Sequence, residues 1–156
     1  MLRILGLLFL ALIVGAAIVT GLAYRQNQRA REYVVAAIPA IYQEWDFAEL
    51  KKRAASKLLN ETQFSVAGPQ MFRMMGASLG RLEKADAPEG EAGFGWGEGA
   101  PARGVYGNYE VHAKFEKGEA QLQLFVIKEG GSWRIAGFHV DSPALLDALR
   151  EQRSTQ

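Results

Sequence analysis

Residues 105–142 alternate apolar and polar side chains in three successive runs, and this alternation predicts three strands. Short glycine-containing turns separate the runs, at Lys117-Gly118 and at Glu129-Gly130-Gly131. Strands joined by such turns pair antiparallel. The first two runs each place an apolar series on a single face, formed by Tyr109, Val111, Ala113 and Phe115 and then by Ala120, Leu122, Leu124 and Val126. One face of the predicted sheet is therefore expected to be buried.

The second and third runs each depart from simple alternation. Phe125 and Ile127 make the other face of the second strand apolar as well, so a helix or a second subunit is expected to cover them. In the third run the spacing of the apolar residues is two, three and two, at Trp133, Ile135, Phe138 and Val140. A β-bulge at Gly137 would return all four to the core face.

Helical patterns precede the strands. An apolar face recurs at helical spacing over residues 33–45, and Pro39 within it is expected to kink the helix or to mark its restart. Asp46 is expected to cap a second helix that runs to about Leu59, with Glu49 in the position of a capping-box partner.

Two further helices are predicted from their end signals. Gly68-Pro69 is expected to open a third helix, for which Gly80 is the natural stop. After the strands, Ser142-Pro143 is expected to cap a final helix that carries Leu145, Leu146 and Leu149. Helices first and then an antiparallel sheet predict the α+β class.

Residues 84–104 are rich in glycine and acidic residues and include Phe94 and Trp96. A glycine-rich loop can cradle phosphate where it leads into a helix, but no helix start follows this one. Its acids, Glu89, Glu91 and Glu98, would also repel phosphate. We therefore expect a flexible loop or an irregular edge strand, with Phe94 and Trp96 pointing to one face.

The N-terminal segment is apolar from residue 4 to residue 23, apart from Thr20 and glycines. Twenty helical residues span about 30 Å, the thickness of the hydrocarbon core of a bilayer. We expect residues 1–24 to be a transmembrane anchor or uncleaved signal-anchor that contacts lipid through residues 4–23. Gly21-Leu22-Ala23 also resembles a cleavage site, and its use would give a secreted domain instead.

A basic juxtamembrane segment, residues 25–31, separates this anchor from the predicted domain at 32–142, and residues 143–156 form a C-terminal helix and tail. Arg25, Arg29 and Arg31 favour an inward domain by the positive-inside rule. The very short N-terminal tail and long apolar core are instead typical of an export signal. We expect a single-pass protein of the inner (cytoplasmic) membrane, with its domain in the periplasm.

Composition excludes several classes of function. The chain of 156 residues contains no cysteine, so disulfides, thiolate catalysis and cysteine-ligated metal are ruled out. Four of the 18 basic residues precede the first acid, Glu32, and the remaining 14 face 17 acids. A body with this net negative charge lacks the basic face that phosphate binding requires. Nucleic acid is not an expected partner.

Three short segments, in order and spacing, carry a resemblance to a known family. They are Ile41 to Trp45-Asp46 at the end of the first helix, Leu79-Gly80-x-Leu82 after the third, and Gly131 to Val140 in the last strand. Over roughly residues 30–142 the chain resembles the nuclear-transport-factor-2-like superfamily. The resemblance implies a strongly bent antiparallel sheet folded around a long helix as a cone. The extra helix after Ser142 departs from the minimal fold, and the chain is most similar to membrane-anchored bacterial domains of unknown function.

Fold membership does not define activity, since the same cone serves as enzyme, ligand pocket or assembly module. Our first hypothesis is a non-enzymatic interaction or scaffold module of an envelope assembly, which pairs with a second copy or with another protein of a membrane complex. The interface residues predicted for it are Phe125, Ile127, Leu145 and Leu149.

The second hypothesis is a binding protein for a small apolar ligand in the cone, and the third an isomerase- or dehydratase-like enzyme. The predicted cone-lining residues are Tyr42, Trp45, Trp96, Tyr109 and Trp133. Asp46 is better explained as a helix cap, and His112 and His139 as solvated residues of the sheet. We therefore predict no catalytic residue, no metal site and no cofactor.

Overall fold

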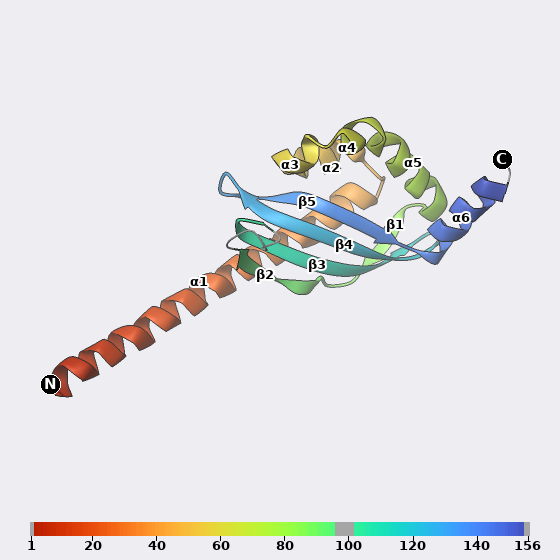
Figure 1. Ribbon diagram of the computed structural model, residues 1–156. Helices are drawn as coiled ribbons and strands as arrows, with labels where there is room; N and C mark the ends of the chain where they lie inside the picture. Colours follow the sequence, from red (N-terminus) through yellow and green to blue (C-terminus); the bar gives the residue numbers. More distant parts are fainter. Residues whose placement is uncertain (1, 96–101, 155–156) are drawn as a thin grey trace.

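The computed structural model describes the backbone of residues 2–95 and 102–154, with side chains for residues 12–95, 102–147 and 150. Within this part the chain is α+β: a long N-terminal helix, short helices, an antiparallel sheet and a C-terminal helix (Figure 1). The helices are α1 (Leu2–Tyr42), α2 (Phe47–Arg53), α3 (Ser56–Leu59), α4 (Thr62–Val66), α5 (Gly68–Leu79) and α6 (Pro143–Ser154). The strands are β1 (Leu82–Ala85), β2 (Glu89–Gly95), β3 (Gly104–Phe115), β4 (Gly118–Glu129) and β5 (Ser132–Asp141).

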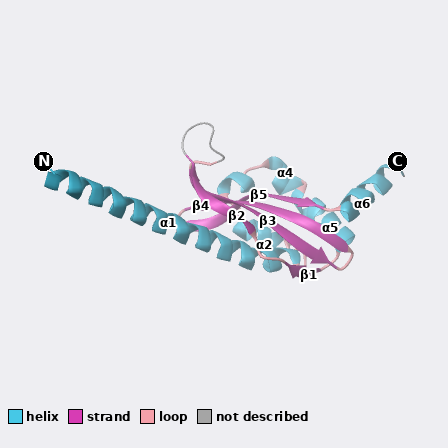
Figure 2. Cartoon of the chain, turned by 90° about the horizontal axis from the view of Figure 1, so that it is seen from below, coloured by secondary structure: helices cyan, strands magenta, loops and turns pink. Residues whose placement is uncertain are grey.

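The sheet is antiparallel throughout, and its order is β1-β3-β4-β5, with β2 also paired to β3. Because β3 is 12 residues long, it pairs with β2 along its first part and with β1 along its last part. The strands β3, β4 and β5 are the three that the alternation predicts. Figure 2 shows the twist of this sheet beside α1, which continues well beyond it toward the N-terminus.

The second half of α1 provides the centre of the core. Its apolar stripe, spaced at three and four residues, lies against the inner sheet face that carries Tyr109 and Phe115. The stripe is fully buried and consists of Ala30, Val34, Ala37, Ile38 and Ile41. Pro39 lies on the exposed side, and α1 continues through it to Tyr42. Of the two alternatives predicted at Pro39, a kink or a restart, the restart is wrong, because α1 is one unbroken helix. Val35, whose carbonyl Pro39 leaves without its helical donor, is also on the exposed side.

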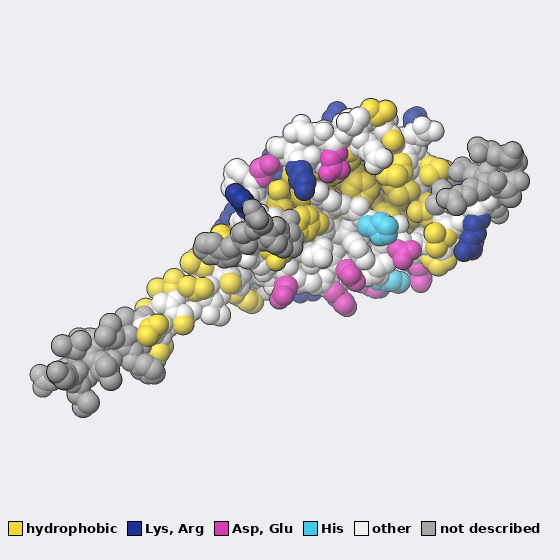
Figure 3. All heavy atoms as spheres, in the orientation of Figure 1, with side chains coloured by type: hydrophobic (Ala, Val, Ile, Leu, Met, Phe, Trp, Pro, Cys, Tyr) yellow, Lys and Arg dark blue, Asp and Glu magenta, His cyan; other side chains and the backbone are white. Residues whose placement is uncertain are grey.

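The first half of α1 lies outside the body of the domain. In the part of the chain whose side chains are described, no helix is both long and apolar enough to cross a membrane. Residues 4–11 of the predicted anchor are outside that part. The described portion is nonetheless apolar and exposed, and Figure 3 shows these side chains along the protruding helix. They are Leu12, Ile13, Val14, Ile18, Val19 and Leu22.

A bulge in the last strand is confirmed, one residue before the predicted position at Gly137. Phe125 pairs with Gly137 and Val126 pairs with Ile135, which leaves Ala136 as the extra residue. The bulge returns Phe138 and Val140 to the inner face with Ile135. Glycine is not required there by crowding, since a Cβ on Gly137 would lie 3.7 Å from Phe125 Cβ, an ordinary contact.

The second predicted helix is interrupted. It runs only to Arg53, because the Ala55 amide donates to Ile135 O at 2.7 Å and Ala54 forms a parallel bridge with Ile135. A new helical turn, α3, starts at Ser56. These contacts cover part of the free edge of β5. The Ala55 amide thus forms a tertiary hydrogen bond to Ile135 in place of a hydrogen bond within the helix.

The glycine-rich segment is more regular than a loop. β1 and β2 cover residues 84–85 and 89–95 of this segment, in agreement with the edge-strand alternative. Phe94 is 55 % exposed, whereas Trp96 lies outside the described residues.

Trp45 joins the helical layer to the sheet. Its backbone is left-handed (φ 51°), and the Asp46 amide donates back to Ile41 O, which ends α1 in a Schellman-like turn. The indole packs against the rings of Tyr42, Phe72 and Phe115 at centroid distances of 5.2–5.4 Å. It also lies over Gly76 of α5, where a Cβ would come within 2.8 Å of Trp45 Cγ.

Gly76→Ala is expected to destabilise the protein by about 1–3 kcal/mol, because the added methyl group overpacks the Trp45 contact. Helix propensity alone predicts the opposite sign, a gain of about 1 kcal/mol. The check is the unfolding free energy of the purified full chain, with Ala77→Ser at the neighbouring exposed position as control. A Gly76→Ala protein more stable than wild type would remove this packing constraint.

Candidate interaction surfaces

Four of the five predicted cone-lining residues lie in the hydrophobic core. Tyr42 and Tyr109 are fully buried, and Trp45 and Trp133 are 8 % exposed. The fifth, Trp96, is outside the described residues. The Tyr42 and Trp45 rings pack with Phe72 and Phe115, so aromatic side chains occupy the space between α1, α5 and the sheet. Binding of a ligand among these residues stays a prediction that the structure does not test.

The polar atoms of these four side chains differ in their partners. Trp45 Nε1 donates to Gly80 O at 2.7 Å, and Tyr109 OH donates to Asn27 Oδ1 at 2.9 Å. Among the described residues, Tyr42 OH and Trp133 Nε1 have no hydrogen-bond partner. Burial raises the pKa of Tyr42 well above that of a free tyrosine, so the phenol stays neutral.

The outer face of the sheet carries a small apolar patch near the N-terminal end of β3. It consists of Tyr106, Phe125 and Ile127, all half-buried, and Tyr106 lies directly opposite Ile127 in the β3–β4 register. The Tyr106 and Phe125 rings are 6.0 Å apart. The Tyr106 ring lies beside Gly93 of β2, and Phe125 is paired with Gly137 of β5, so neither neighbouring position carries a side chain on the sheet surface.

Phe125 and Ile127 were expected to be covered by a helix or a second subunit, and this patch shows part of their cover. The aromatic ring of Tyr106 covers part of it, and α1, Trp45 and Phe72 pack against the other face of the sheet. The role of Phe125 and Ile127 in an interface stays a prediction. Tyr106 was not among the predicted residues, because only the cross-strand register brings it beside Phe125.

His112 lies farther along the outer face, between two carboxylates. Its Nδ1 is 3.4 Å from Asp86 Oδ2, and its Nε2 is 3.5 Å from Glu119 Oε2. Lys84 also pairs with Asp86 at 2.8 Å, and its hydrogen bond, more than that of His112, holds the pKa of Asp86 below the usual value. The two carboxylates take both ring nitrogens of His112, and the imidazole is half-exposed, which fits the predicted surface position.

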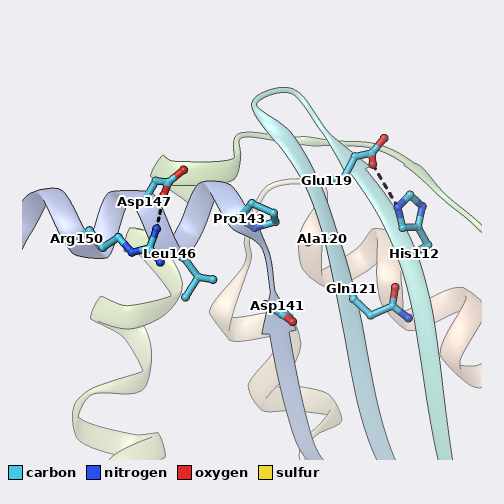
Figure 4. A pocket seen from close by; sticks show the side chains of 9 residues that line it. All are labelled: His112, Glu119, Ala120, Gln121, Asp141, Pro143, Leu146, Asp147 and Arg150. Carbon is cyan, nitrogen blue, oxygen red and sulfur yellow. Dashed lines mark hydrogen bonds and ion pairs between the residues drawn. The ribbon is translucent and has the colours of Figure 1, made fainter.

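An open groove of about 530 Å³ lies between this histidine and α6 (Figure 4). Figure 4 shows Glu119 turned toward His112 on the sheet side, and Asp147 paired with Arg150 on the helix side. Asp141 also lines it, whereas His139 is exposed outside it.

The C-terminal helix is attached differently from the prediction. Ser142 is buried, and its hydroxyl donates to Glu119 O of β4 at 2.7 Å instead of capping α6. Its carbonyl accepts from the Leu146 amide, which starts the helix. Of the predicted interface residues here, Leu145 packs against the core, and the Leu149 side chain is outside the described residues. Leu146 is 49 % exposed.

Two of the groups with catalytic potential, Asp46 and Tyr33, have structural roles. Asp46 Oδ1 accepts the amides of Ala48 and Glu49, which confirms it as the cap of α2. Tyr33 OH donates to Arg53 O. Among the described residues, no group of three or more His, Asp or Glu side chains is placed to hold a metal ion.

Comparisons with known proteins give no further assignment. No family model matches the chain, no curated protein matches it, and no solved structure matches it. The geometry of the chain itself is therefore the basis for a proposal about its function.

Two buried tyrosines provide a matched prediction. Tyr109→Phe should cost about 1 kcal/mol, since it removes the hydrogen bond to Asn27, whereas Tyr42→Phe removes an unpaired buried hydroxyl and should be neutral or stabilising. The measurement is denaturant unfolding of both variants at neutral pH. Equal losses would mean that Tyr42 OH has a partner in solution.

The contribution of Tyr42 to stability depends on pH, and the direction of that dependence can be predicted. Because burial raises the pKa of Tyr42, the folded state holds this proton more tightly than the unfolded chain does. The stability that this proton contributes is complete below the ordinary tyrosine pKa of about 10 and is lost as pH rises above it. The alkaline loss of stability should be smaller in Tyr42→Phe than in wild type.

Proposed function

We propose that this chain is a non-enzymatic, membrane-anchored interaction module with a nuclear-transport-factor-2-like cone fold, which acts in an assembly of the bacterial envelope. Its anchor is the first half of α1, its domain faces the periplasm, and it docks through the outer face of its sheet. The long helix beside a twisted antiparallel sheet supports the fold assignment.

The observation that carries this proposal is the exposure of the apolar half of α1. Leu12 is 72 % exposed and Val19 is 66 % exposed. Four other large apolar side chains of this segment are at least half-exposed, namely Ile13, Val14, Ile18 and Leu22. Water is a poor environment for such a continuous apolar cylinder. The hydrocarbon of a bilayer covers all sides of a single helix, which suits an apolar segment without a polar stripe.

The domain and its anchor share one helix. α1 is 41 residues long, about 60 Å, and its second half is the core helix of the domain. No loop intervenes between residues 2 and 42, so the domain is held close to the membrane in a restricted orientation. This arrangement suits a scaffold whose docking surface must face a partner in the same membrane.

The patch of Tyr106, Phe125 and Ile127 is the proposed docking surface, with a second copy as its partner. Confinement in one membrane keeps two copies parallel and raises their effective concentration, so a small apolar patch can be sufficient for pairing. A self-complementary pair of this kind is the commonest symmetric assembly.

A second candidate function rests on a different surface. Between α5, β5 and α6 lies a groove of about 360 Å³ lined by Met71, Met74, Phe138, Leu145 and Leu146, among other residues. Methionine side chains adapt to varied apolar shapes, so a small apolar ligand could bind here. This candidate differs from the first in needing no second copy.

The double substitution Val14→Lys/Ile18→Lys should release the protein from membranes. Each lysine costs about 2.5–3.5 kcal/mol near the centre of a bilayer, and these two lie one turn apart on α1. The measurement is the fraction retained in the membrane pellet after alkaline carbonate extraction. Val35→Lys, at an exposed apolar position of the same helix within the domain, is the control and should leave retention unchanged.

A fusion protein reports on which side of the membrane the domain lies. Alkaline phosphatase fused after Gln156 should be active in wild type, because the enzyme folds only outside the cytoplasm. Wild-type protein that washes off the membrane would refute the anchor, and a retained but inactive fusion would place the domain inside.

Phe125→Glu should shift the protein from dimer toward monomer, since a carboxylate at the centre of the patch would be buried without a partner. The measurement is the mass of the detergent-solubilised full chain by light scattering coupled to size exclusion. Gln123→Glu adds the same charge at the next exposed position of β4 and should leave the mass unchanged. A Phe125→Glu variant with the mass of wild type would contradict docking through this face.

A further inference from the structure

One end of the sheet is fastened to α1 just after its apolar half. Asn27 Oδ1 accepts the Ala92 amide of β2 at 3.0 Å and the Tyr109 hydroxyl of β3 at 2.9 Å. One residue earlier, Gln26 Oε1 accepts from Lys128 Nζ of β4 at 3.1 Å. Three neighbouring strands are thus bonded to one short stretch of helix.

The length of α1 between its apolar half and these hydrogen bonds determines how far the bonds lie from the hydrocarbon core of the bilayer. Asn27 is four positions after Ala23, which is about 6 Å along the helix axis. The headgroup layer on each side of a bilayer is about 5–8 Å thick. With the proposed anchor embedded, this end of the sheet lies at the level of the lipid headgroups, so the inference rests on the proposed function.

The direction of β2 shows which end of the sheet is nearest the membrane. β1 lies beside Val35, Ile38 and Pro39 of α1, whereas Ala92 of β2 lies beside Asn27. The chain therefore descends toward the N-terminal half of α1 as it passes from β1 into β2. Gly95, and Gly104 opposite it, are at the lower end, and Arg103 precedes Gly104.

Basic side chains gather at this lower end. Arg25, Arg29 and Arg103 are exposed, and Lys128 is half-buried beside Gln26. Burial raises the pKa of Tyr109, and Arg31 and Glu91 both lie close enough to this phenol to affect the same pKa in opposite directions. Their opposite charges add nothing to the net charge of this end.

Two acids of the described part of the chain, Glu32 and Glu129, also lie at this end. Glu32 is exposed on α1, and the Glu129 carboxylate accepts the Ser56 amide but keeps its charge. Among the described residues of this end, Arg25, Arg29, Arg103 and Lys128 therefore outnumber the two acids.

We propose that this foot, formed by Arg25, Arg29, Arg103 and Lys128, is a seat for anionic lipid headgroups. Arginine and lysine at headgroup level interact favourably with lipid phosphates, and several together select anionic membranes. The lipid contact adds a second attachment beside the helix and limits tilting of the domain on its anchor. The groove beside α6 and His112, at the opposite end of β3, then faces away from the membrane.

The test uses the full chain in nanodiscs and exploits the absence of cysteine. Ser132→Cys, at the exposed start of β5 and paired with Glu129 of β4, carries a spin label, and collisions with a nickel chelate attached to lipid headgroups report its contact with the membrane surface. Ala77→Cys on α5, at the far end of the domain, is the distance control. Collisions at position 132 should rise severalfold when anionic lipid is added to a neutral bilayer, and high salt should reverse the rise.

Removing charges at two places on the domain distinguishes a specific lipid-binding seat from a general electrostatic attraction of the whole protein to an anionic membrane. Arg29→Gln/Arg103→Gln should abolish the dependence on anionic lipid, whereas Arg73→Gln/Lys117→Gln removes two charges from the far end and should preserve it. Equal collisions in neutral and anionic bilayers, or equal effects of the two pairs, would overturn the lipid seat while leaving the anchor intact. A full chain that does not incorporate into nanodiscs would overturn the anchor and the seat together.

Discussion

The packing of α1 against the inner face of the sheet is the interaction on which the rest of the structure depends. Its buried stripe, from Ala30 to Ile41, fills the centre of the core. Asn27 and Gln26 then hold β2, β3 and β4 by hydrogen bonds. The Asn27 side chain accepts an amide on the free side of β2, a strand edge that would otherwise be open to other chains. One helix thus supplies the core, closes an edge and leads into the apolar segment.

The second constraint is the aromatic cluster around Trp45. The left-handed turn at Trp45 directs its indole onto Phe72 and Phe115, and Gly76 provides the space. This cluster packs the helical layer against the sheet and fills the space between α1, α5 and the inner sheet face. It supports a function at surfaces, where the patch of Tyr106, Phe125 and Ile127 and the exposed half of α1 offer apolar area.

The elements that depend on local signals were predicted from the sequence. Asp46 caps α2, Gly68-Pro69 opens α5 and Gly80 ends it with a positive φ of 76°. The bulge before Gly137 followed from a slip in the spacing of apolar residues. Elements that depend on distant partners were not predicted: Ala55 breaks a helix to bond Ile135, and the Ser142 hydroxyl bonds Glu119 O instead of capping α6. For the candidate surface, Phe125 and Ile127 were found from alternation, while Tyr106 and the pairing of His112 with Asp86 required the strand register.

By itself the sequence determined the α+β class, the strand alternation and the apolar N-terminal segment, because each depends on a pattern of residues close together along the chain. Only the tertiary structure decided that this apolar segment and the core helix are one continuous α1. It also decided that Pro39 is tolerated on an exposed side and that Asn27 joins the anchor end of α1 to the sheet. The physical reason is that burial and hydrogen bonding between residues more than 60 positions apart outweigh local propensity.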